Sequence, residues 1–169
     1  MNNVFVLVAL PVFLVGAALC DISRREIPNM LTACMAIVGV GVSVAGIGET
    51  TLTRALLAGT VSLGVGIVLQ LARLMGGGDV KLFAALGVWL GPAGTVDAAL
   101  ATAIAGGVLA VFYLRRTTAE RAPNSTPVSA ALARLQLDDG PDFLRVPYAV
   151  AIAAGGLWVW LSRFGASAT

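Results

Sequence analysis

The stretch ALLAGTVSLGVGIVLQLARLM, residues 55–75, runs directly into GGGDVKLFAALGVWL, residues 76–90. The first part is 21 residues of mainly apolar sequence, close to the roughly 20 residues that a helix needs to cross a hydrocarbon core. Four further apolar runs have comparable lengths: Val4–Cys20, Met30–Ile47, Ala98–Leu114 and Val146–Leu161. Val80–Leu90 is shorter, and its 11 residues give only about 17 Å of helix. We expect it to extend through residues 91–94 or to begin below the membrane surface.

The composition agrees with this division into spans. Of the 169 residues, 58% are hydrophobic and 12% are charged, with a mean hydropathy of +0.91, whereas soluble domains carry roughly 25% charged residues. These values exclude a soluble single-domain enzyme and predict an all-α integral membrane protein, with residues 1–169 forming one polytopic domain. A net charge of +2 is too small to indicate binding to nucleic acid.

The basic residues predict the orientation of six alternating spans. Only Arg54 and Arg163 fall on one side of the membrane. The other side would hold the remaining nine, which are Arg24, Arg25, Arg73, Lys81, Arg115, Arg116, Arg121, Arg134 and Arg145. Because cytoplasmic loops are enriched in Lys and Arg, we expect both termini outside the cytoplasm and a cytoplasmic loop at about residues 115–145.

Two acidic residues lie at the ends of apolar runs on the predicted cytoplasmic side. Asp21 directly follows the first run, and Asp79 directly precedes the short fourth one. Carboxylates at membrane depth usually face a polar cavity or a partner, so these two indicate a paired site. One neutral and one ionised carboxyl group around a water molecule can hydrolyse a peptide bond. Other interpretations are a proton or cation pathway, or an N-cap at Asp79 and a membrane boundary at Asp21.

Other hydrolytic and metal sites are excluded by composition. The chain has no His, which removes Ser-His and Cys-His hydrolases and His-bearing zinc sites. Its two Cys cannot form a four-Cys zinc site. We therefore expect no metal and no cofactor.

Three local sequences bear on the choice between these interpretations. MGGGDVK, residues 75–81, fits a G-x-G-D-x-K pattern, and DISRREIPN, residues 21–29, places an Asp six residues before Ile-Pro-Asn. VPYAV, residues 146–150, opens the last apolar run with a Pro-Tyr pair. In this order, and spanning nearly the whole chain, they resemble the type IV prepilin leader peptidases, the G-x-G-D class of membrane aspartic endopeptidases.

The resemblance implies that Asp21 and Asp79 are catalytic and cleave the leader peptide of a prepilin at the cytoplasmic face of the bacterial inner membrane. Its implied partners are the leader and apolar helix of the prepilin and the lipid bilayer. The supporting residues implied by the three motifs are Gly76, Gly78, Lys81, Pro28, Asn29, Pro147 and Tyr148. The glycines would let the backbone approach Asp79 closely, and Lys81 would hold positive potential near the two carboxylates or a phospholipid headgroup.

Pro28 and Asn29 resemble a turn and cap that start the second span and position Asp21. Only the nine residues 21–29 join the first two runs, so the zinc-binding insert of larger family members, which accompanies N-methylation, is absent. The chain is similar instead to the compact branch that serves tight-adherence (Flp-type) pili.

Two alternatives remain: a broader intramembrane protease of the presenilin or signal-peptide peptidase kind, and a small proton- or cation-coupled transporter using the same carboxylates. The oligomeric state stays open.

Overall fold

The computed structural model describes residues 4–24, 26–48, 50–119 and 148–165. Regular structure in these ranges is helical throughout: α1 (Val4–Arg24), α2 (Asn29–Val44), α3 (Leu52–Leu71), α4 (Gly77–Ala119) and α6 (Tyr148–Gly165). Leu52–Leu71 and Gly77–Phe112 are long and apolar enough to cross a membrane. The prediction of an all-helical fold is confirmed for the described residues, while six spans and the placement of both termini outside stay predictions.

The helices begin and end a few residues away from the apolar runs. α1 continues through Arg24, so Asp21 lies within its last turns instead of after them. α4 continues to Ala119, so residues 115–119 of the expected cytoplasmic loop are helical, while residues 120–147 lie outside the described part of the chain. Hydropathy marks where the chain meets polar surroundings, whereas a helix ends where its backbone hydrogen bonds end.

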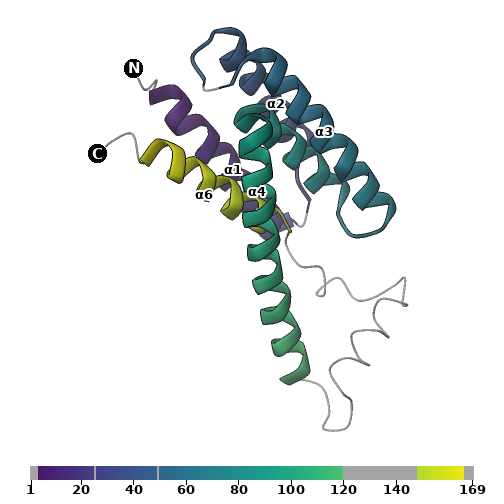
Figure 1. Ribbon diagram of the computed structural model, residues 1–169. Coiled ribbons are helices and arrows are strands. Elements are labelled where there is room, and N and C mark those ends of the chain that lie inside the picture. The colour runs from purple at the N-terminus through teal and green to yellow at the C-terminus, as the bar shows by residue number, and fades with distance from the viewer. Residues whose placement is uncertain (1–3, 25, 49, 120–147, 166–169) are drawn as a thin grey trace.

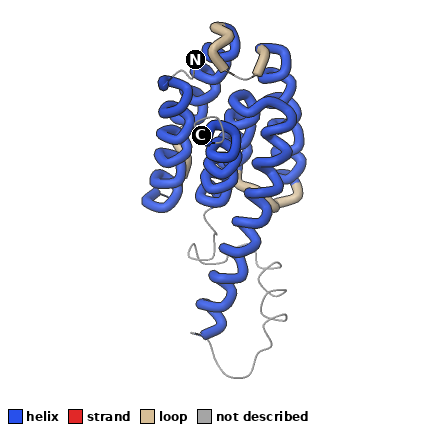
Figure 2. The backbone as a smooth tube through the Cα atoms, turned by 60° about the vertical axis from the view of Figure 1, so that its left-hand side comes forward, coloured by secondary structure: helices blue, strands red, loops and turns tan. Residues whose placement is uncertain are grey.

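α4 is interrupted at Gly91, where the chain reverses direction. The backbone of this residue has φ 66° and ψ −178°, a region open essentially to glycine alone. The segment before it packs along α3, and the segment after it packs along α6 and extends past the other helices (Figure 1; Figure 2). The helix that contains the short fourth apolar run therefore begins earlier than the run, at Gly77. The expectation that this helix continues straight through residues 91–94 is wrong, because the chain turns at Gly91.

The core lies between α1, α2, the first segment of α4 and α6. Its largest fully buried side chains are Leu10, Leu14, Met35, Leu82, Leu86 and Ile152. Large apolar side chains are also exposed on every helix, among them Ile37 on α2, Val68 on α3 and Trp158 on α6. So much exposed apolar surface is unusual for a soluble monomer, and it suits a protein surrounded by lipid. Both described ends of the chain lie at one end of the bundle (Figure 1).

The crossing of α4 and α6 depends on a glycine, which gives a prediction about stability. A Cβ at Gly155 would lie 2.7 Å from the backbone nitrogen of Thr102 and 2.9 Å from the carbonyl oxygen of Ala98. We expect Gly155→Ala to lower the free energy of unfolding by about 1–3 kcal/mol, because the α4 backbone must move. Gly107→Ala is the control, since a Cβ there meets no atom within 4 Å. Equal thermal stability of the two variants in detergent would contradict the close crossing.

Candidate active site

Asp21 is held at the beginning of α6. The backbone N–H of Ala149 donates a hydrogen bond of 3.2 Å to Asp21 Oδ2. Ala149 is the second residue of an 18-residue helix, and the first N–H groups of a helix have no partner within it and carry partial positive charge. A carboxylate suits this position, so an element 128 residues further along the chain fixes the Asp21 side chain.

Asp79 lies in the first turn of α4 and is oriented by the glycine segment before it. The backbone N–H of Gly76 donates a hydrogen bond to the Asp79 carboxylate. A Cβ at Gly76 would lie only 2.9 Å from Asp79 Oδ2, closer than nonbonded carbon and oxygen atoms normally approach. Glycine is therefore required at this position for steric reasons, because the side chain of a larger residue would displace the carboxylate.

Asp21 and Asp79 lie at the same end of the bundle although 58 positions separate them in the sequence. Asp21 is near enough for its charge to act on Asp79, and both side chains are half-buried. Like charges that interact in a partly desolvated place do not readily coexist, so ionisation of one carboxyl group disfavours ionisation of the other. Such a pair can accept a proton at one group and donate a proton at the other.

Lys81 and Asn29 form a second contact at the same end of the bundle. Lys81 Nζ donates a hydrogen bond of 2.8 Å to Asn29 Oδ1, which joins α4 to the first residue of α2. The expectation that Asn29 caps α2 is wrong. Pro28 occupies the N-cap position, no side chain caps the helix, and the amide oxygen of Asn29 is used by Lys81.

The connection between α1 and α2 also packs against the glycine segment. A Cβ at Gly78 would lie 3.3 Å from Cβ of Ile27, so the start of α4 and the residues that follow Asp21 are in close contact. Pro28 continues this connection, and its carbonyl oxygen accepts hydrogen bonds from the backbone N–H groups of Leu31 and Thr32. The residues predicted from the first two motifs therefore lie together.

The third motif contributes through its backbone. Tyr148 is the first residue of α6 and its side chain is partly exposed, while Pro147 lies outside the described residues. Among the described residues of this segment, Ala149 contacts an aspartate, and no prediction from the sequence named it. A backbone N–H has no side-chain signature, so only its place directly after the Pro-Tyr pair could have pointed to it.

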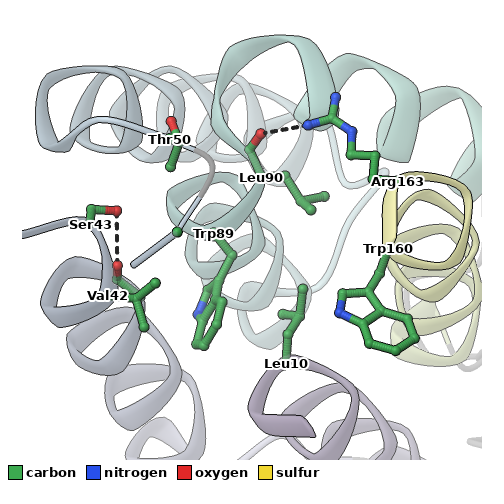
Figure 3. A pocket seen from close by; sticks show the side chains of 10 residues that line it. Leu10, Val42, Ser43, Thr50, Trp89, Leu90, Trp160 and Arg163 are labelled. Atoms are coloured by element: carbon green, nitrogen blue, oxygen red, sulfur yellow. Dashed lines mark hydrogen bonds between the residues drawn. The ribbon is translucent and has the colours of Figure 1, made fainter. Parts of the chain in front are cut away.

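The opposite end of the bundle has a small cavity of about 20 Å³, which has room for about one water molecule. Arg163 lines it, and its guanidinium group donates a hydrogen bond of 3.4 Å to the carbonyl oxygen of Leu90 (Figure 3). The same group pairs with Asp97, also at 3.4 Å. These contacts join the end of α6 to the two sides of the reversal at Gly91. The cavity is too small for a peptide, so the end with the two aspartates is the candidate active site.

Among the described residues, no group of three or more His, Cys, Asp or Glu side chains is placed to hold a metal ion. Comparison with curated proteins and with solved structures gave no match. The sequence does match the type IV leader peptidase family over residues 8–111. This match spans more than half of the chain and includes both aspartates and the glycine segment. The chain therefore belongs to the type IV leader peptidase family.

Proposed function

We propose that this protein is a membrane aspartic endopeptidase that removes the leader peptide from prepilins, with Asp21 and Asp79 as its catalytic residues. The observation that carries the proposal is the convergence of the two carboxylates at one end of the bundle, where the charge of one acts on the other. Membership of a peptidase family supports peptide hydrolysis as the use of this pair.

In the proposed reaction, a water molecule between the two carboxyl groups attacks the carbonyl carbon of the scissile peptide bond. The ionised carboxylate accepts a proton from the water, and the neutral carboxyl group donates its proton to the carbonyl oxygen. The carboxyl group that took the water proton then transfers it to the leaving nitrogen, and the other carboxylate takes back the proton from the hydroxyl group. The carbon–nitrogen bond breaks, which releases the leader and restores the starting pair. The N–H groups of Ala149 and Gly76 hold the two carboxyl groups in place during these steps.

The proposal includes a location and a substrate class. Six spans with both termini outside would put Asp21 and Asp79 at the cytoplasmic face of the bacterial inner membrane, where a basic prepilin leader lies. The short connection between α1 and α2 supports assignment to the compact tight-adherence branch, which cleaves without a zinc-binding insert. Family membership favours this peptidase over a proton- or cation-coupled transporter.

A reconstituted cleavage assay tests this function. The purified protein in liposomes would be mixed with prepilins from tight-adherence pili and from other type IV pili, and the products would be identified by N-terminal sequencing. We expect cleavage at one site, after the leader, and faster cleavage of the tight-adherence prepilins. Empty liposomes give the background rate. Absence of cleavage for every prepilin, together with a proton flux across the same liposomes, would overturn the proposal in favour of transport.

A further inference from the structure

An open groove runs along the first α4 segment, between α2 and α3. It has a volume of about 390 Å³, which is within the range of ordinary ligand pockets. α2 and α3 form its two walls, and they contact each other much less than each contacts α4. Small side chains line much of it, including Ala33, Ala36 and Ala84, while Lys81 and Asn29 lie at one end.

We propose that this groove binds one anionic phospholipid, with its phosphate on Lys81 and an acyl chain between α2 and α3. The Lys81 ammonium group has three N–H donors and is exposed, and Asn29 uses only one of these donors. From Lys81 the groove follows α4 to Val88, over seven residues or about 10 Å of helix. A cationic head site continued by a narrow apolar channel matches the shape and charge of one phospholipid molecule.

The position of the groove argues against the substrate as its occupant. Residues two apart on a helix point roughly 200° away from each other, so Lys81 and Asp79 lie on opposite sides of α4. A peptide in the groove would have the α4 helix between itself and the carboxylates. The positive charge of Lys81 would also repel the basic leader of a prepilin, whereas it attracts phosphate.

A bound lipid would affect the active site through the Lys81–Asn29 contact. Asn29 is the first residue of α2 and follows the short connection that begins after Asp21. A phosphate bound at Lys81, next to Asn29, would stabilise the packing of α2 against α4. The acyl chain would in the same way stabilise the position of α2 relative to α3. The placement of the phosphate in the cytoplasmic leaflet rests on the orientation given under Proposed function, whereas binding itself requires no cleavage.

Thermal unfolding in detergent tests the proposal without any substrate. Phosphatidylglycerol or phosphatidylcholine would be added to the wild type and to four variants, and each Tm shift would be taken relative to the same variant without lipid. We expect phosphatidylglycerol to raise the Tm of the wild type more than phosphatidylcholine does, because binding to the folded state stabilises it. Lys81→Gln and the groove-filling Ala33→Leu should lose most of that shift, and Lys81→Arg should keep it.

Arg24→Gln is the matched control for charge, since Arg24 is an exposed cation at the end of α1 and does not line the groove. Equal shifts with both lipids, a full shift in Lys81→Gln, or an equal loss in Arg24→Gln would each overturn the proposal. A prepilin peptide that cross-links to a photoreactive group at Ala33 and abolishes the lipid shift would overturn it too, and would assign the groove to the substrate.

Discussion

Asp21→Asn and Asp79→Asn should each reduce the rate of leader cleavage by about 10²–10⁴-fold, the usual contribution of a general acid or base. Asparagine preserves the size of the side chain and keeps an oxygen that can accept the hydrogen bond from Ala149 N–H or Gly76 N–H. The fold should therefore remain intact while proton transfer is lost. Initial rates of prepilin cleavage at matched membrane levels, together with the Tm of each variant, measure both effects.

Asp97→Asn is the matched control for these two variants. Asp97 is exposed and pairs with Arg163 at the opposite end of the bundle, where an exposed ion pair contributes little to stability. Its replacement should leave the cleavage rate unchanged. A normal rate in Asp21→Asn or in Asp79→Asn would refute the two-aspartate mechanism.

The double variant gives a further test of whether the carboxyl groups act as one unit. Groups that share a single step have strongly non-additive effects. Replacing both aspartates should therefore slow cleavage about as much as replacing one. If the two losses multiply instead, Asp21 and Asp79 contribute to separate steps.

The helical class of the fold could be predicted because hydropathy and span length depend only on local sequence. The reversal at Gly91 could not be predicted in the same way. The glycine and proline at residues 91–92 were also compatible with an extension of the fourth apolar run. The chain turns because Gly91 adopts a positive φ in a place where it packs against the buried Thr50. The position of the turn also depends on how α3 and α6 pack against the two segments of α4, which the local sequence does not reveal.

The placement of Asp21 and Asp79 at the same end of the molecule was predicted because both lie at the same boundary of apolar runs, whereas their action as a catalytic pair stays a prediction. The contacts that orient these side chains could not be inferred in that way. The N–H of Ala149 has no side-chain signal, and Asn29 was interpreted as a cap because amide side chains often cap helices. Its contact with Lys81 depends on how α2 and α4 lie against each other, which the sequence of neither helix reveals.

Gly76→Ala should reduce cleavage by about 10²-fold with little loss of stability, because a small displacement of a catalytic group has an effect of that size. The added Cβ would meet the end of the Asp79 side chain at 2.9 Å and no backbone atom within 4 Å. The carboxyl group can therefore rotate away without disturbing the helices. That rotation would break its hydrogen bond with Gly76 and separate it from Asp21.

Two other glycines provide a graded comparison. A Cβ at Gly64 on α3 meets nothing within 4 Å, so Gly64→Ala should cleave at the normal rate. A Cβ at Gly78 would meet Ile27 at 3.3 Å, a contact that a shift of a few tenths of an ångström relieves, so Gly78→Ala should be intermediate. Rates would be compared with the Tm of each variant. A normal rate in Gly76→Ala would show that the position of the Asp79 carboxylate does not limit cleavage. A slow rate accompanied by a large fall in Tm would instead assign Gly76 to folding.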